Sequence, residues 1–132
     1  MGFIGRIQSF SDSRVRLIRN YNNLGIAATL NRGIELASAD LIARMDADDI
    51  SHPRRLEKQL AFIETNPDGA LYSCWATEIT EEGAPLYTLR FPPEHYFFNM
   101  TFSCWIYHPT MVFRTAAVKV VGKYTASYSE DF

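Results

Sequence analysis

The sequence has few cysteines, no long apolar run and almost no net charge, and each lack excludes a class of protein. Two cysteines in 132 residues cannot build a disulfide framework, and Cys74 and Cys104 are not spaced as a pair of metal ligands. We therefore expect reduced, buried thiols. The formal net charge of -2 argues against a nucleic-acid-binding protein, because phosphate recognition needs a concentrated basic surface.

Segments that would direct the chain to or across a membrane are also missing from the sequence. No apolar stretch approaches the roughly 20 residues that a membrane-spanning helix needs. The first residues, Met1 to Arg6, lack the long apolar core of a secretory signal, so we expect a cytoplasmic protein. A composition that is 47% hydrophobic over 132 residues suits one globular domain, which we predict to cover residues 1–132.

The spacing of apolar residues predicts alternating strands and helices. Ile26, Leu30 and Ile34 recur at three- and four-residue steps and predict a helix from residue 26 to 38. A second helix is predicted from Ser51 to residues 66–69, which end it, and its apolar stripe is Leu56, Leu60 and Ile63. Further helices are predicted near 94–103 and in a short segment that ends at Val121, with Gly122 as its C-terminal cap. Strands are predicted at 15–18, 41–45 (buried on both sides), 70–77, 86–91 and 110–114. This order is typical of an α/β fold with a mixed sheet.

An acidic cluster follows the apolar run 41–43 directly. Asp46, Asp48 and Asp49 repel one another unless water, a basic partner or a cation neutralises them. In open α/β sheets ligands bind beyond the carboxyl ends of strands, and hard oxygen ligands suit Mg²⁺ or Mn²⁺. The alternative is a solvated turn in which Asp49 caps the next helix. An EF-hand is excluded, because the glycine and glutamate that its loop requires are missing.

Several motifs surround this cluster in a recognisable order. Within residues 22–67 they are Asn23-x-Gly25, Ala28, Asn31-x-Gly33-Ile34, Asp46-x-Asp48-Asp49, Pro53-x-Arg55-Leu56 and Gln59, and the stretches 108–114, 122–124 and 129–132 follow. With these motifs the chain resembles, over roughly residues 14–132, a family 2 glycosyltransferase of the GT-A fold, which uses nucleotide-sugar donors.

The resemblance implies a role for each acidic motif. Asp46 and Asp48 would hold Mg²⁺ or Mn²⁺ on the diphosphate of the donor, which we expect to be a UDP-sugar. Asp131 would be the catalytic base of an inverting transfer to an acceptor hydroxyl, and Glu130 would hold the acceptor or orient Asp131. Without the resemblance, Glu130 and Asp131 would be taken as a frayed chain end. The implied acceptor is a glycan or a lipid-linked molecule in cell-surface polysaccharide biosynthesis, with the full-length protein at the inner face of the membrane.

Other candidate substrate contacts each have a structural alternative. Arg44 can contact a phosphate or form a structural ion pair, and Asn31 suits either the nucleotide loop or a purely structural role. His108 can face the acceptor cleft or lie at the edge of the core, and Trp105 is the best aromatic candidate for stacking on a sugar ring. The substrate-binding candidates are Asn23, Gly25, Asn31, Arg44, Asp46, Trp105 and His108.

Family members begin with a strand, a helix and a second strand ending in Asp-Asp-Gly-Ser, and these would precede Asp12. We therefore expect a partial GT-A domain, truncated at the N-terminus and the C-terminus, with a mixed, mainly parallel sheet flanked by helices. An open sheet edge predicts a homo-oligomer. Two alternatives remain: a sugar-activating nucleotidyltransferase, whose glycine-rich phosphate loop is not found in this sequence, and a catalytically inactive truncated module.

Overall fold

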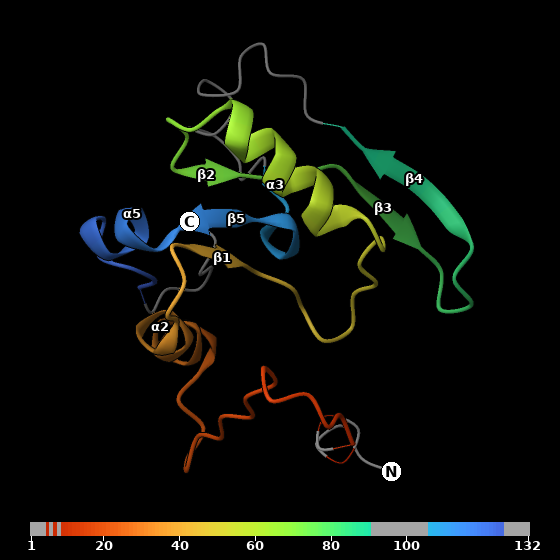
Figure 1. Ribbon diagram of the computed structural model, residues 1–132. Helices are drawn as coiled ribbons and strands as arrows, with labels where there is room; N and C mark the ends of the chain where they lie inside the picture. The colour runs from red at the N-terminus through yellow and green to blue at the C-terminus, as the bar shows by residue number, and fades with distance from the viewer. Residues whose placement is uncertain (1–4, 6, 8, 91–105, 126–132) are drawn as a thin grey trace.

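The protein is an α/β structure built from short elements. The computed structural model describes Gly5, Ile7, residues 9–90 and residues 106–125 (Figure 1). The elements in these ranges are α2 (Ile26–Leu36), β1 (Leu41–Ala43), α3 (Arg55–Thr65), β2 (Leu71–Tyr72), β3 (Ala76–Ile79), β4 (Pro85–Leu89), the 3₁₀ turn η1 (His108–Thr110), β5 (Val112–Arg114) and α5 (Thr115–Val120). In these parts of the chain no helix has the length and apolar character needed to cross a membrane.

The main sheet has the strand order β1-β5-β2, and β3 and β4 form a separate hairpin. Ile42 of β1 is opposite Phe113 of β5, and Tyr72 of β2 is opposite Val112 of β5. Both pairings are antiparallel, so β1 and β2 run the same way with β5 inserted between them (Figure 1). The α/β class is confirmed. The expected mainly parallel pairing is wrong for the described strands, because β5 enters the sheet from the opposite direction.

Helices cover both faces of the main sheet. On one face Val112 and Tyr72 pack with Ile63 of α3. On the other face Phe113 and Met111 pack with Ile34 of α2 and with Val118 of α5. This alternation follows from the two-residue period of a strand, which turns Val112 and Phe113 to opposite sides. Val112 is the most buried of these side chains, with 2% of its surface exposed, so β5 is the centre of the core.

The predicted helices are largely confirmed, but of the predicted apolar stripe of α3 only Ile63 is buried. Leu56 and Leu60 are 48% and 46% exposed, while Gln59 and Ile63 are buried. The helix is turned so that Gln59 reaches a backbone carbonyl beneath it, and this turns the two leucines outward. The predicted helix at 94–103 lies outside the described residues. The predicted C-terminal cap is confirmed, since Gly122 has a φ of +99°.

The predicted strands differ more from the structure. Residues 15–18 are irregular, and side chains hold this region: Arg16 donates to the Leu36 carbonyl, and Arg32 donates to the Arg19 carbonyl. The predicted strand 70–77 is divided between β2 and β3, which belong to different sheets. The predicted strand 41–45 is β1 but ends at Ala43, and it is half-buried or exposed along its length. The predicted 86–91 strand is β4, which pairs with β3.

Candidate functional site

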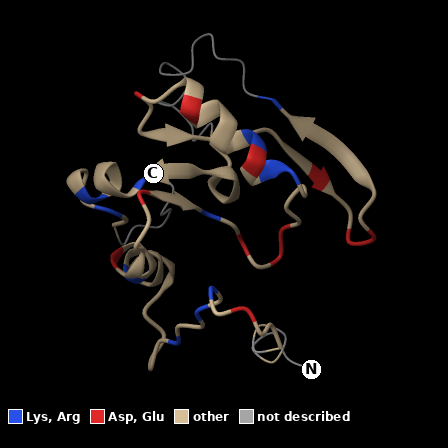
Figure 2. Ribbon diagram, in the orientation of Figure 1, with Lys and Arg blue, Asp and Glu red and all other residues tan. Residues whose placement is uncertain are grey.

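The acidic loop (residues 44–49) leaves the carboxyl end of β1, and the chain then leads into α3. Its three aspartates lie in sequence between Arg44 and α3, and Figure 2 shows acidic residues along the chain that joins β1 to α3. Arg44 is buried, Asp46 is half-buried, and Asp48 and Asp49 are exposed. The loop is thus open to solvent on the side of its carboxylates and anchored on the side of Arg44.

Arg44 anchors the loop through an ion pair with Asp46. Its Nη1 atom donates to Oδ2 of Asp46 at 2.5 Å, and its backbone N–H donates to the Met111 carbonyl of the neighbouring chain segment at 2.9 Å. Within the described residues, Arg44 Nε is a buried donor without a hydrogen-bond partner. The structural ion pair, one of the two predicted alternatives for Arg44, is therefore present, and phosphate contact stays a prediction.

The carboxylates of the loop disfavour one another's charge. Burial, and then the charges of Asp46 and Asp48, raise the pKa of the Asp49 carboxyl, while Arg44 and Arg55 oppose this shift. A bound cation would reverse the effect of the neighbouring carboxylates, since opposite charge favours the ionised form. The loop therefore has the electrostatic character of a cation site.

The donor set of the loop fits a metal that keeps other ligands. The described ranges contain no group of three or more His, Cys, Asp or Glu side chains placed to hold a metal ion. Any metal at this loop would therefore take at most two of these side chains as ligands, and Asp46 and Asp48 are the two that the sequence predicts. Mg²⁺ is commonly bound by one or two carboxylates together with water and substrate phosphates, so two are enough.

A tyrosine–glutamate pair lies beside the acidic loop and was not predicted. Tyr107 donates its hydroxyl proton to Oε1 of Glu78 in β3 at 3.0 Å. Burial, together with this hydrogen bond and the charges of Glu78 and Asp49, raises the pKa of Tyr107 to about 12. Glu78 also raises the pKa of Tyr87 in β4 through a hydrogen bond. The β3–β4 hairpin is therefore tied to the segment before η1 by a contact that the strand pattern does not predict.

The predicted nucleotide-loop residues form a local turn before α2 and a long-range contact between α2 and the segment after α5. The Asn23 side chain accepts a hydrogen bond from the Gly25 backbone N–H at 2.9 Å, which shapes the entry to α2. Gly25 precedes that helix with a φ of +76°, a backbone conformation that favours glycine. Asn31 hydrogen-bonds the backbone of Tyr124 through both ends of its amide, at 2.8 and 2.9 Å. This is the structural role that we considered for Asn31.

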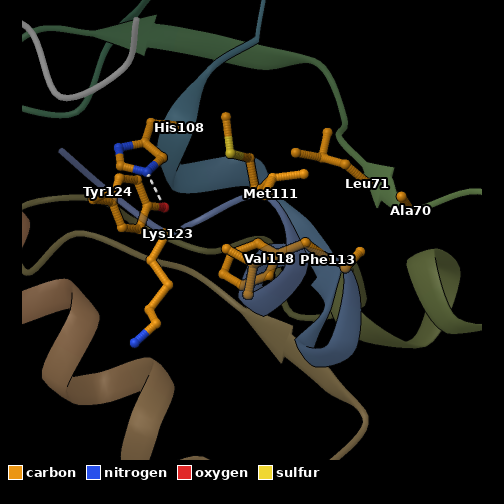
Figure 3. Close-up of a pocket in the computed structure, with 10 residues that line it drawn as sticks. Ala70, Leu71, His108, Met111, Phe113, Val118, Lys123 and Tyr124 are labelled. Carbon is orange, nitrogen blue, oxygen red and sulfur yellow. Dashed lines mark hydrogen bonds between the residues drawn. The ribbon is translucent and has the colours of Figure 1, made fainter.

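His108 lies in the core next to an apolar cavity. It is 5% exposed, and its Nε2 atom is 2.6 Å from the Tyr124 hydroxyl (Figure 3). The cavity of about 330 Å³ lies between β2, β5 and α5, and most of its lining is apolar. The core-edge alternative for His108 is therefore the one seen. Trp105, Glu130 and Asp131 lie outside the described residues, so their predicted roles stay predictions.

Comparison with known proteins points to one family. The family model described as glycosyl transferase family 2 matches residues 4–121. The chain is 36% identical over 113 residues to an uncharacterised glycosyltransferase of Methanocaldococcus jannaschii, a match that covers 82% of this chain and 38% of the relative. It is 30% identical over 121 residues to an uncharacterised glycosyltransferase of Haemophilus influenzae (89% of this chain, 45% of the relative).

A third relative has a fuller description. The chain is 29% identical over 121 residues to the UDP-Gal:alpha-D-GlcNAc-diphosphoundecaprenol beta-1,3-galactosyltransferase of Escherichia coli, covering 83% of this chain and 41% of that protein. The chain thus spans less than half the length of each of these three relatives.

Proposed function

The chain belongs to glycosyl transferase family 2, whose fold is GT-A, and on this basis we propose that it binds the diphosphate of a nucleotide-sugar through a divalent metal. The observation that carries the proposal is the acidic loop. Its carboxylates sit at the carboxyl end of a sheet strand, where α/β folds bind ligands, and Asp49 has a raised pKa there. The comparisons favour glycosyl transfer over the nucleotidyl transfer considered above.

Asp46 and Asp48 are the proposed ligands for Mg²⁺ or Mn²⁺. The metal, when bound, would neutralise the charge that grows on the leaving diphosphate. Arg44 holds one oxygen of Asp46, so it restrains the direction in which that carboxylate can point. Asp48 is exposed and free to approach the donor side.

The remaining parts of the reaction rest on the family alone. We propose an inverting transfer in which Asp131 accepts the proton of the acceptor hydroxyl and Glu130 orients it. A UDP-sugar donor and a lipid-linked acceptor are supported by the name of the Escherichia coli relative, which uses UDP-Gal and a diphosphoundecaprenol acceptor. A cytoplasmic site of action, at the inner face of the membrane, and a role in polysaccharide biosynthesis belong to the same proposal.

Metal binding tests the proposal directly. We would titrate Mn²⁺ into the 132-residue chain with and without UDP and follow the free-ion signal by electron paramagnetic resonance, with a UDP-only correction. The chain should bind Mn²⁺ and bind it more tightly with UDP. Asp48→Asn should weaken binding at least roughly tenfold, since even outer-shell changes commonly cost that much.

The matched control is Asp68→Asn, which removes the same charge from an exposed loop after α3. It should bind Mn²⁺ as the parent chain does. Equal affinity of the parent chain and Asp48→Asn would overturn the metal assignment.

A further inference from the structure

Two polar side chains on one face of α3 connect the acidic loop to the turn before β5. We call Arg55 and Gln59 the α3 clamp. Arg55 Nε donates to Oε1 of Gln59 at 3.1 Å, so the two side chains act as one unit. Gln59 is 7% exposed and Arg55 is half-buried. Polar groups this far from water persist only when they are hydrogen-bonded, and these are.

The clamp reaches three backbone carbonyls on two segments. Arg55 Nη2 donates to the Arg44 carbonyl at 2.7 Å, and Nη1 donates to the Pro109 carbonyl at 2.8 Å. Gln59 Nε2 donates to the Thr110 carbonyl at 2.8 Å. One end of the clamp thus holds the first residue of the acidic loop, and the other end holds η1.

The backbone of Arg44 is consequently held through both its N–H and its C=O group. Its N–H donates to the Met111 carbonyl and its C=O accepts from Arg55. Its side chain in turn holds Asp46. A displacement of the Arg44 backbone would therefore move Asp46, one of the two proposed metal ligands.

We propose that Arg55 and Gln59 are positioning residues that hold the acidic loop in its metal-binding conformation without touching the metal. This inference rests on the proposed function. An arginine is required because its planar fork can donate to two carbonyls in different directions, whereas a lysine provides one point of charge. A glutamine is required because it must accept from Arg55 and donate to Thr110 with the same side chain.

The first test compares two neighbouring arginines. Arg55→Lys keeps the charge but cannot make both carbonyl contacts, and we expect Mn²⁺ affinity in the presence of UDP to fall roughly 10–100-fold, the usual effect of losing an outer-shell partner. Arg54→Lys is the matched control, because Arg54 is exposed and pairs with Glu57 instead. It should bind Mn²⁺ as the parent chain does.

A second control separates positioning from general loss of stability. Val112→Ala weakens the core at β5 without altering a clamp residue. Under conditions where all variants are folded by circular dichroism, Val112→Ala should keep its Mn²⁺ affinity while Arg55→Lys and Gln59→Leu lose theirs. Amide hydrogen exchange at residues 45–48 should become faster in Arg55→Lys and stay unchanged in Arg54→Lys.

The outcomes distinguish the two proposals. If the parent chain binds Mn²⁺, Asp48→Asn weakens it, and Arg55→Lys matches the parent chain in affinity and exchange, the clamp proposal is wrong and the metal proposal stands. If Val112→Ala weakens Mn²⁺ binding as much as Arg55→Lys does, the clamp has only a structural role. If the parent chain binds no Mn²⁺, both proposals fail together.

Discussion

Asn31 should contribute to the stability of the fold, and replacing it with alanine tests this. Its amide bonds both the N–H and the carbonyl of Tyr124, at 2.9 and 2.8 Å. The Tyr124 hydroxyl in turn lies 2.6 Å from His108. Asn31 therefore ties α2 to the segment after α5 and, through it, to the turn before β5. Asn31→Ala removes both hydrogen bonds of this tie at once.

The expected loss of stability follows from the two hydrogen bonds. Each contributes about 0.5–1.5 kcal/mol to the free energy of unfolding, so the pair contributes about 2 kcal/mol. Alanine is a better helix former than asparagine by about 0.5 kcal/mol, which offsets part of the loss. Because Asn31 is half-buried, water can reach part of the freed backbone. The net effect should be a destabilisation of about 1–2 kcal/mol.

Urea denaturation followed by circular dichroism measures this change, with Asn22→Ala as a control at an exposed asparagine of the preceding loop. The control should alter the free energy of unfolding by less than about 0.5 kcal/mol. UDP binding is measured on the same proteins by calorimetry. If Asn31→Ala unfolds like the parent chain but loses affinity for UDP, the structural reasoning is refuted and Asn31 is a nucleotide contact.

Three further substitutions should change the free energy of unfolding in a direction that the structure determines. Gly33→Ala should stabilise the chain by about 0.5–1 kcal/mol in urea denaturation, because Gly33 lies in α2 with open space around an added Cβ. Gly69→Ala should destabilise the chain by about 1–3 kcal/mol in the same assay, because the added Cβ would lie 2.6 Å from the Tyr72 ring. Asp49→Asn should leave the free energy of unfolding unchanged below a pH of about 4 and raise it by less than about 1 kcal/mol at neutral pH. The reason is that the pKa of Asp49 is raised in the folded state, so its ionised carboxylate destabilises the fold increasingly as the pH rises through that pKa. A constant difference between the two proteins from pH 3 to 8 would contradict this.

Apolar periodicity predicted where the helices lie better than which side of them is buried. In α2 the period placed Ile34 correctly, since that residue is 3% exposed, but the predicted Ile26 is 49% exposed and Ala27 is buried instead. In α3 the same reasoning selected Leu56 and Leu60, yet Gln59 is buried in their place. Hydrophobicity alone cannot predict this, because the burial of Gln59 depends on a hydrogen bond to the Thr110 carbonyl, 51 residues away.

Strand prediction was limited by pairing, which a local pattern does not contain. The run 70–77 was predicted as one strand, but the Arg114 backbone N–H bonds the Ala70 carbonyl while Ala76 pairs with Leu89 of the hairpin. The segment therefore divides according to its partners. Residues 15–18 show the converse, since a sequence with strand propensity is irregular where side-chain donors hold it instead of a strand ladder.

The sequence predicted the position of the acidic loop at the end of β1, but it did not predict the contacts that hold the loop. The acidic loop alone was equally compatible with a solvated turn, and the surrounding motifs of the family resemblance made it the candidate site; its metal-binding role stays a prediction. The contacts that shape it come from afar: Arg55 bonds Pro109 across 54 residues, and Tyr107 bonds Glu78 across 29. Asn31 stands in a family motif and Arg44 lies two residues before one, yet both bond protein groups in this structure. A motif thus identifies a residue that belongs to the site. The burial and the hydrogen-bond partners of that residue then distinguish a ligand-binding residue from one that positions a ligand-binding residue.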